Sequence, residues 1–528
     1  MRAKNLALRV LSTAAMLSIV TSIAAPAFAA TYYINDGSVD VNVSDTGVVT
    51  VEQGGVTYKD GLGSVVIRGG TRSEGEKDDR TQAGASPATQ EADGSNAPAG
   101  NETEAPKSEN TAGDAAPKQE TTAAGERKEG TPQQEPTEEE EEEQQEQQEP
   151  TEEKVTPEPA KAKAEAPKAT QKPSAEQEEE QQEQQEKEDE PTVPSAPAKS
   201  TENVITIVNN FVDTAKQAFS FVLDNVNIDR SKNYSSNNSA ALTVKGNGDT
   251  EIELDGNNIL KGGSYHAGLE KNDRDGTGTL TIKDEKIAAD GSKGSLLAVG
   301  NSDSAGIGGS SKGGIGNTSN ITITGGNITA ISGWYGAGIG GGDNGYGKDI
   351  TITGDATVKA SGYHGAGIGG GPGGGSSDGS GKVTISGHAN VTAFSNTGAG
   401  IGGGASGCAD VTISEDATVF AQGYNGGTGI GTGETADPNT STSVGNRTSI
   451  RISDRANVTA ISDNIGIGST SWHDTQTQIE ITGGTINIAS RSSQYPVIGV
   501  TPNDDMTLTI NGSTGNSYTC SCIYKCIR

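Results

Sequence analysis

Aromatic side chains recur shortly before one glycine-rich motif of this sequence. Aromatic residues make up only 4% of the chain, yet several stand a few residues ahead of an Ala-Gly or Thr-Gly pair. These residues are Tyr265, Trp334, Tyr335, Tyr363 and Tyr424. Flat aromatic faces suit sugar rings, which have an apolar body and wet hydroxyls. A ligand-binding row of rings is therefore one prediction, and the alternative is that the rings only cover glycine-rich turns.

A glycine-rich loop near residue 343 contains oxygen-bearing side chains that suit calcium. Asp343, Asn344 and Asp349 follow a glycine pair and resemble a calcium-binding nonapeptide, because carboxylate and amide oxygens are the ligands that Ca²⁺ takes. Tandem nonapeptides are absent, so an ordinary loop is the alternative. Calcium is the one cofactor that the sequence indicates.

Other candidate chemistry is weaker. The pattern Gly336-x-Gly338-x-x-Gly341 fits dinucleotide-binding loops, but a strand rather than a helix follows it, which argues against a nucleotide site. The four histidines lack metal-ligand spacing and are predicted to be solvated turn residues. Arg451 and Arg455, on either side of Asp454, come nearest to the basic centre of a polysaccharide lyase. We predict that the protein is not an enzyme.

The elements that must position these side chains form a repeat. Ile321–Thr324, Ile350–Thr353 and Val383–Ser386 alternate apolar and small polar residues, and each precedes an Ala-Gly-Ile-Gly-Gly-Gly motif. A period of two is typical of half-buried strands. The motif returns about every 30 residues, inside the roughly 20–50-residue window of solenoids and arrays.

Stacked repeats can bury an apolar face that one repeat cannot. Strands about 4.8 Å apart would align equivalent isoleucines into internal ladders. One ladder is Ile323, Ile352, Ile385 and Ile413, and the other is Ile339, Ile368, Ile401 and Ile430. The fold class predicted is all-β, a right-handed parallel β-helix. A propeller or antiparallel prism would need about four strands or clear hairpins per repeat.

The chain divides into five regions by composition. We expect a signal peptide at 1–29, N-terminal β-helix coils at 30–70, a disordered insertion at 71–200, the β-helix repeat domain at 201–512 and an atypical tail at 513–528. Residues 1–29 have a basic start, a short apolar run and an Ala-Phe-Ala site. A membrane anchor is the alternative, but the run falls short of about 18 residues. No other stretch could span a bilayer, so the mature protein is expected to be secreted and extracellular.

The expected insertion is rich in Glu, Gln, Pro and Ala, with a coiled-coil-like low complexity. It lacks the large apolar residues that would offset chain entropy, so we expect disorder. The alternative is a linker between two independent modules. The chain carries a net charge of −31, which argues against nucleic acid because phosphate contacts need clustered Lys and Arg.

The tail differs from everything upstream. Cys520, Cys522 and Cys526 could supply three metal ligands, but a tetrahedral site needs a fourth. The interpretation that we favour is a tail that is out of frame or prematurely ended.

Several runs resemble one protein family. They are Leu223–Asp229, Ala241–Val244, Ile252–Asn258 and His266–Glu270, followed by the Gly-Ala-Gly-Ile-Gly-Gly-Gly turns. This combination resembles secreted bacterial surface proteins with a carbohydrate-binding right-handed parallel β-helix. The resemblance implies a fold similar to polysaccharide lyases, non-catalytic polysaccharide binding and, in some members, calcium.

Three functions follow in order. The leading hypothesis is an exported, cell-surface-associated β-helix that binds polysaccharide or another glycan without catalysis. The second is a structural or adhesive stalk that contacts host or cell-surface proteins. The third is a polysaccharide lyase-like enzyme.

Overall fold

The computed structural model describes residues 30–82, 198–511 and the backbone of 517–521, except for short internal segments. Those segments are 64, 77, 214, 216, 233–237, 287–290, 312–313, 315, 374–380, 435–447, 471–475, 493 and 501–505. The predicted signal peptide, residues 83–197 of the predicted insertion and most of the tail lie outside the described residues. Among those described, no helix has the length and apolar character needed to cross a membrane.

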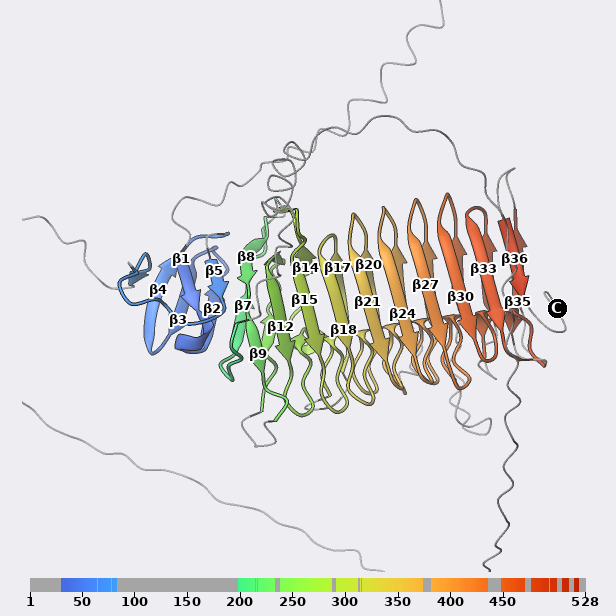
Figure 1. Ribbon diagram of the computed structural model, residues 1–528, viewed down its shortest axis with the longest axis horizontal. Helices are drawn as coiled ribbons and strands as arrows, with labels where there is room; N and C mark the ends of the chain where they lie inside the picture. The colour runs from blue at the N-terminus through green and yellow to red at the C-terminus, as the bar shows by residue number, and fades with distance from the viewer. Residues whose placement is uncertain are drawn as a thin grey trace, which may run out of the picture. The chain divides into compact units, whose positions relative to one another are not determined.

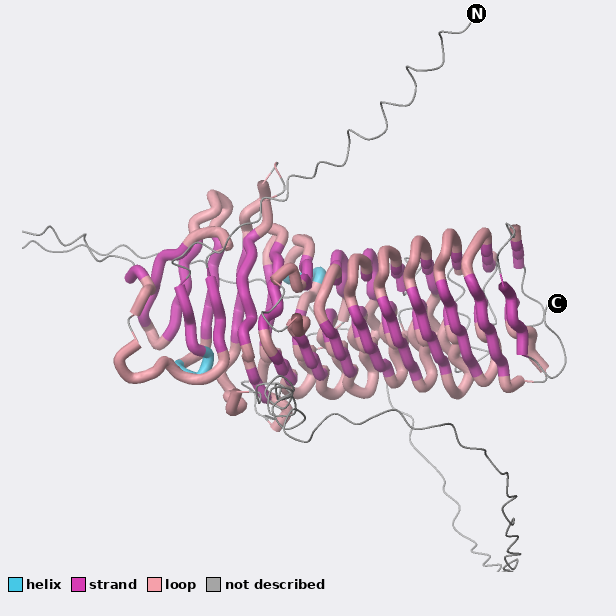
Figure 2. Tube along the Cα trace, turned by 45° about the horizontal axis from the view of Figure 1, so that its top comes forward, coloured by secondary structure: helices cyan, strands magenta, loops and turns pink. Residues whose placement is uncertain are grey.

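Three sheets built largely from parallel strands make up the described part of the chain (Figures 1 and 2). The first sheet contains β1 (Ala30–Tyr33), β5 (Val65–Arg68), β8 (Phe219–Asp224), β11 (Thr250–Asp255), β14 (Leu280–Lys283), β17 (Thr318–Ile323), β20 (Gly347–Ile352), β23 (Gly381–Ile385), β26 (Ala409–Ile413), β29 (Ser449–Ile452), β32 (Thr477–Ile481) and β35 (Met506–Ile510).

The second sheet contains β9 (Asn227–Asp229), β12 (Asn257–Lys261), β15 (Ser295–Val299), β18 (Asn327–Ile331), β21 (Thr357–Gly362), β24 (Asn390–Ser395), β27 (Thr418–Gly423), β30 (Asn457–Ser462), β33 (Thr485–Ser490) and β36 (Ser517–Ser521).

The third sheet contains β2 (Val39–Val43), β3 (Val49–Gln53), β4 (Val56–Asp60), β6 (Thr81–Gln82), β7 (Ile205–Asn209), β10 (Leu242–Lys245), β13 (Leu269–Glu270), β16 (Ile307–Gly308), β19 (Ile339–Gly340), β22 (Ile368–Gly369), β25 (Ile401–Gly402), β28 (Ile430–Gly431), β31 (Ile467–Ser469) and β34 (Ile498–Val500). Two short 3-10 helices, η1 (Ile34–Asp36) and η2 (Asp273–Asp275), complete the elements.

Each coil takes one strand from each sheet, and successive coils stack in register. In one coil the chain runs through β17, β18 and β19, and the next coil repeats this order with β20, β21 and β22. Ile339, Ile368 and Ile401 lie in one ladder and are fully buried. The second predicted ladder is also in register and buried. The all-β parallel β-helix predicted from the sequence is therefore confirmed.

The glycines of the repeat motif are needed because neighbouring coils approach closely at the third sheet. Gly340, Gly369 and Gly402 have φ values of +134°, +134° and +131°, a region that residues with a Cβ rarely adopt. A Cβ atom on Gly369 would lie closer than 3.0 Å to the carbonyl oxygen of Gly402. The glycine run is thus fixed by the stacking of the coils themselves.

The N-terminal stretch joins the stack but does not continue it as regular coils. β2 pairs in parallel with β7, and β5 pairs in parallel with β8, so these two N-terminal strands join the sheets that continue from Ile205 onward. β2, β3, β4 and β6, however, form an antiparallel meander. Gly54 and Gly55, with φ values of +62° and +77°, form the two-residue hairpin that reverses the chain.

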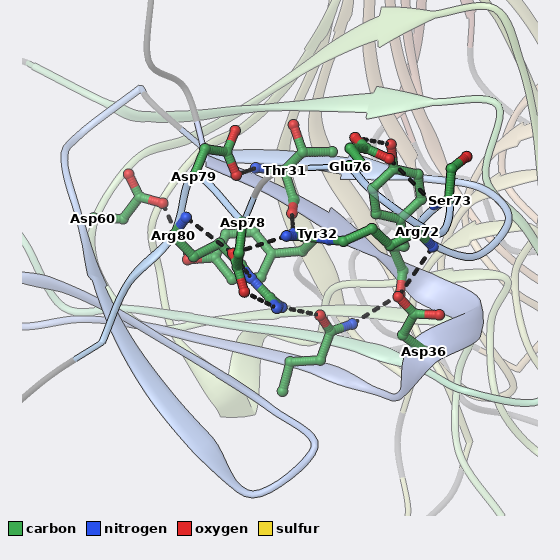
Figure 3. Close-up of polar contacts among 12 residues, drawn as sticks. Thr31, Tyr32, Asp36, Asp60, Arg72, Ser73, Glu76, Asp78, Asp79 and Arg80 are labelled. Atoms are coloured by element: carbon green, nitrogen blue, oxygen red, sulfur yellow. Dashed lines mark hydrogen bonds and ion pairs between the residues drawn. The ribbon is translucent and has the colours of Figure 1, made fainter.

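Residues 71–82 belong to this N-terminal structure, although the sequence placed them in the disordered insertion. β6 pairs with β4, and Arg80 packs over the Tyr58 ring at 4.3 Å. The Arg80 guanidinium binds Asp78 through two 2.7 Å contacts (Figure 3) and donates to Gln53 at 2.9 Å. The hydrogen bonds from Arg80 lower the pKa of Asp78. Residues 71–82, which the sequence assigned to the insertion, therefore cover β4, which would otherwise be an exposed edge strand.

The tail pairs with the last regular coil. β36 lies parallel to β33, with Ile488 opposite Cys520. The sequence predicted that this stretch fits nothing upstream, but its backbone continues the second sheet. Parallel pairing depends on backbone groups, which any sequence can supply.

Candidate functional site

The predicted aromatic residues lie in the turns that join the second sheet to the third. We call these the corner turns. They include residues 262–268, 300–306, 332–338, 363–367, 396–400, 424–429, 463–466 and 491–497. Because β16, β19 and β22 are only two residues long, each corner turn also contacts the turn that follows the third sheet. Asp343, for example, donates its backbone N–H to the carbonyl oxygen of Asp303 at 2.8 Å.

Four aromatic side chains from two neighbouring coils form one cluster. The ring of Trp334 stacks on that of Tyr363 with a centroid distance of 4.1 Å and an interplanar angle of 23°. Tyr335 stacks on His364 at 4.9 Å and 19°. Trp334, Tyr335 and Tyr363 are 52%, 40% and 37% exposed. We call these four residues the aromatic cluster, and it forms an exposed surface on a rigid turn scaffold.

The aromatic row is interrupted on both sides of this cluster. The preceding corner turn has Ser302 and Asp303 at the equivalent positions, and the following one has Asn396 and Thr397. Tyr265, 51% exposed, lies beyond the first interruption, and half-buried Tyr424 lies beyond the second. The sequence predicted a row of five rings, and the structure instead joins three of them and adds a histidine.

His364 is the aromatic-cluster member that sequence reasoning assigned to solvated turns. Its Nδ1 lies 3.0 Å from the Thr397 hydroxyl oxygen, and its backbone N–H donates to the Trp334 carbonyl oxygen at 3.2 Å. Burial lowers the pKa of His364, so the imidazole is neutral at neutral pH. His364 precedes Gly-Ala-Gly at the same distance as Tyr335 does. This match is the sequence signal that could have identified His364 as a member of the aromatic cluster.

Two carboxylates lie beside the aromatic cluster. Asp303 is half-buried, burial raises its pKa, and its carboxylate has no hydrogen bond or ion pair within the described part of the chain. The pKa of Asp343 is raised first by burial and then by Asp303, and its Oδ2 accepts from the Asn344 amide at 2.9 Å. Asp303 was missed from sequence because a single aspartate among serines has no motif.

Two of the three predicted calcium ligands are adjacent, and the third has another partner. Asp343 and Asn344 are hydrogen-bonded, whereas Asp349 lies on β20 and forms an ion pair with Lys382 at 2.5 Å. In residues 30–82 and 198–511, outside the gaps given above, no group of three His, Cys, Asp or Glu could hold a metal ion. Calcium binding stays a prediction.

The two arginines considered for lyase chemistry are each paired with a carboxylate. Arg455 contacts Asp416 at 2.6 and 2.5 Å, and the Arg451 Nε lies 3.3 Å from Glu480. Such exposed pairs contribute little to stability, because water and salt screen them. Arg451 also lines a shallow depression on the first sheet with Asp410, Thr412 and Ser449.

Comparison with known proteins supports the repeat and the fold. Residues 321–343, 350–372 and 383–405 match a family model described as Beta helix repeat. A search of curated proteins and a search of solved structures returned no match. The first two matched segments contain the aromatic cluster, so this part of the chain is similar to a known β-helix repeat.

Proposed function

We propose that this protein is an exported, non-catalytic β-helix that binds extracellular polysaccharide through the aromatic cluster. The observation that carries the proposal is the exposure of Trp334, Tyr335 and Tyr363 on turns held by the stacked coils. Exposed large aromatic side chains are unusual on a surface that has no ligand, because their burial is favourable. A sugar ring can cover these faces while its hydroxyls remain in water.

The rigidity of the scaffold supports binding without chemistry. Each ring is fixed by its stacking partner and by backbone hydrogen bonds between coils, so little conformational entropy is lost when a ligand binds. Secretion and association with a cell surface belong to the same proposal. Secretion is inferred from the N-terminal sequence, and association with a cell surface is inferred from the resemblance to bacterial surface proteins.

A protein partner is the second candidate. The outer face of the second sheet carries apolar side chains next to the corner turns. Ile331 is 41% exposed, and the rings of Phe394 and Phe420 lie 5.7 Å apart. An adhesive stalk would use such a face, because exposed apolar patches mark protein interfaces.

A glycan array with the full secreted chain, followed by a polysaccharide pull-down, tests the proposal. We expect Trp334→Ala/Tyr335→Ala/Tyr363→Ala to lose retention with an unchanged circular dichroism spectrum. Tyr495→Ala is the matched control, since Tyr495 lies in the corner turn between β33 and β34, and it should bind like wild type. Full retention by the triple variant would refute the proposal.

One further assay separates the remaining functions. A lyase would release unsaturated sugars that absorb ultraviolet light, and we expect no such release from the glycans that bind. Binding to proteins but to no glycan on the array would favour the adhesive stalk.

A further inference from the structure

One coil between Tyr265 and the aromatic cluster carries a carboxylate where its neighbours carry rings. Tyr265, Asp303 and Tyr335 stand at the same distance ahead of Ala-Gly in three successive corner turns. The strands that follow these turns pair in register, β13 with β16 and β16 with β19. The turns are also joined directly, since Asn301 donates to the His266 carbonyl oxygen at 3.1 Å and Trp334 donates to that of Ser302. The three residues therefore stand at equivalent positions in three stacked corner turns.

The spacing of the coils sets the distance between the two tyrosines. Coils stack about 4.8 Å apart, so positions two coils apart are separated by roughly 10 Å. Two aromatic faces that contact a flat ligand on both sides would be about 7–8 Å apart, because optimal carbon contacts are about 3.5–4.0 Å. A pyranose chair is thicker than a flat ring, so the interval suits one sugar ring better than an aromatic one.

Tyr265 and Tyr335, the residues on the two sides of this interval, are each supported by neighbouring residues. Tyr265 has a φ of +64°, and the next residue, His266, is buried with its Nδ1 2.6 Å from the Glu270 carboxylate. Glu270 in turn accepts from the Asn272 amide at 3.0 Å. On the other side, Trp334 and Tyr335 stack on Tyr363 and His364, which lie on the next coil away from the interval.

The carboxylates between Tyr265 and Tyr335 favour ligands with hydroxyl donors and disfavour anionic ligands. The half-buried Asp303 carboxylate has no hydrogen bond or ion pair in the described part of the chain, and Asp343 of the next coil donates its backbone N–H to the Asp303 carbonyl oxygen at 2.8 Å. A carboxylate accepts strong, charge-assisted hydrogen bonds from hydroxyl groups. Two neighbouring carboxylates would repel a uronate, sulfate or sialic acid, and desolvating that pair of like charges costs further free energy.

We propose that the interval between Tyr265 and Tyr335 is a subsite for one uncharged pyranose ring, with the Asp303 carboxylate accepting hydrogen bonds from its hydroxyls. The inference rests on the proposed glycan binding and adds the ligand class, which is a neutral rather than an acidic polysaccharide. It also adds Tyr265 and Asp303 as residues that determine specificity.

An array of neutral and acidic glycans, probed with the full secreted chain, tests the subsite. We expect wild-type protein to bind neutral glycans and not uronate-containing or sialylated ones. Titration calorimetry with the strongest neutral binder should then show at least a tenfold loss of affinity in Asp303→Asn and in Tyr265→Ala. Asp355→Asn is the matched control, since Asp355 is an exposed carboxylate in the turn between β20 and β21, and its affinity should be unchanged.

The outcomes separate the subsite from the binding function on which it rests. If Trp334→Ala abolishes binding while Asp303→Asn and Tyr265→Ala bind within twofold of wild type, the subsite is wrong and the glycan-binding proposal stands. Preference for acidic glycans would also overturn the subsite. Absence of binding to any glycan would overturn both proposals together.

Discussion

Replacing Gly369 by alanine tests whether the coils approach as closely as the structure shows. Gly369 lies on β22 with a φ of +134°, and a Cβ atom there would meet the carbonyl oxygen of Gly402 on the next coil. Backbone atoms on both coils are already fixed by the parallel ladder, so neither coil can move away without losing hydrogen bonds. The expected effect is local opening of the stack around the third sheet.

The size of this effect follows from two contributions. A residue with a Cβ in a sparsely populated backbone region costs about 1–3 kcal/mol, and forcing extra atoms into a packed site costs about 1–3 kcal/mol. The loss of chain entropy in the unfolded state offsets about 0.4–1 kcal/mol of this. We therefore expect Gly369→Ala to lower the free energy of unfolding by roughly 1–5.5 kcal/mol.

Gly55→Ala is the matched control, because it has the cost of a positive φ without a clash between the Cβ atom and a neighbouring coil. Gly55 also has a positive φ, +77°, but nothing lies within 4 Å of the Cβ position, so we expect a loss of about 1 kcal/mol. Urea unfolding followed by circular dichroism measures both variants against wild type. An equal loss in the two variants would refute the close approach of the coils.

Three further predictions concern the core, a carboxylate and the N-terminal meander. Ile368→Ala, at a fully buried position, should lower the free energy of unfolding in urea by about 2–5 kcal/mol. Ile331→Ala, at a position 41% exposed, should lower it by well under half as much. Equal losses would contradict the burial of Ile368 in the apolar core. The pKa of Asp343 is raised in the folded state, so its ionised form destabilises the fold above that pKa, and the penalty disappears as the pH falls through it. Asp343→Asn should therefore melt at a higher temperature than wild type at pH 7 and at the same temperature near about pH 3, and a lower melting temperature at pH 7 would contradict the sign. Arg80→Ala removes the contacts with Asp78 and Tyr58; we expect about 1–3 kcal/mol of destabilisation and self-association through uncovered strands in size-exclusion chromatography with light scattering, whereas a stable monomer would contradict the covering role.

The stacking of coils was predictable because the sequence repeats the two signals that stacking requires. Ile339, Ile368 and Ile401 recur with a fixed motif, and the buried side of a parallel solenoid favours apolar side chains in register. The adjacent glycines mark the close backbone approach, so both the core and its crowded face could be predicted from residue type and spacing alone.

The antiparallel meander and the interrupted aromatic row were not predictable in the same way. Gly54-Gly55 marks a turn in the sequence, but the turn pair alone does not decide whether the next strand reverses or continues a coil. The aromatic residues lie in corner turns whose lengths differ, such as 332–338 and 363–367. Side-chain stacking in such turns depends on loop geometry rather than on period.

Fluorescence of Trp334 tests the glycan-binding account most directly. The chain has two tryptophans, so a Trp472→Phe variant leaves Trp334 as the sole indole, at a position 52% exposed. Titration with the strongest neutral glycan from the array should blue-shift its emission and reduce its quenching by acrylamide, in a saturable manner that follows binding. Binding of the same glycan with unchanged emission and quenching of Trp334 would contradict the account.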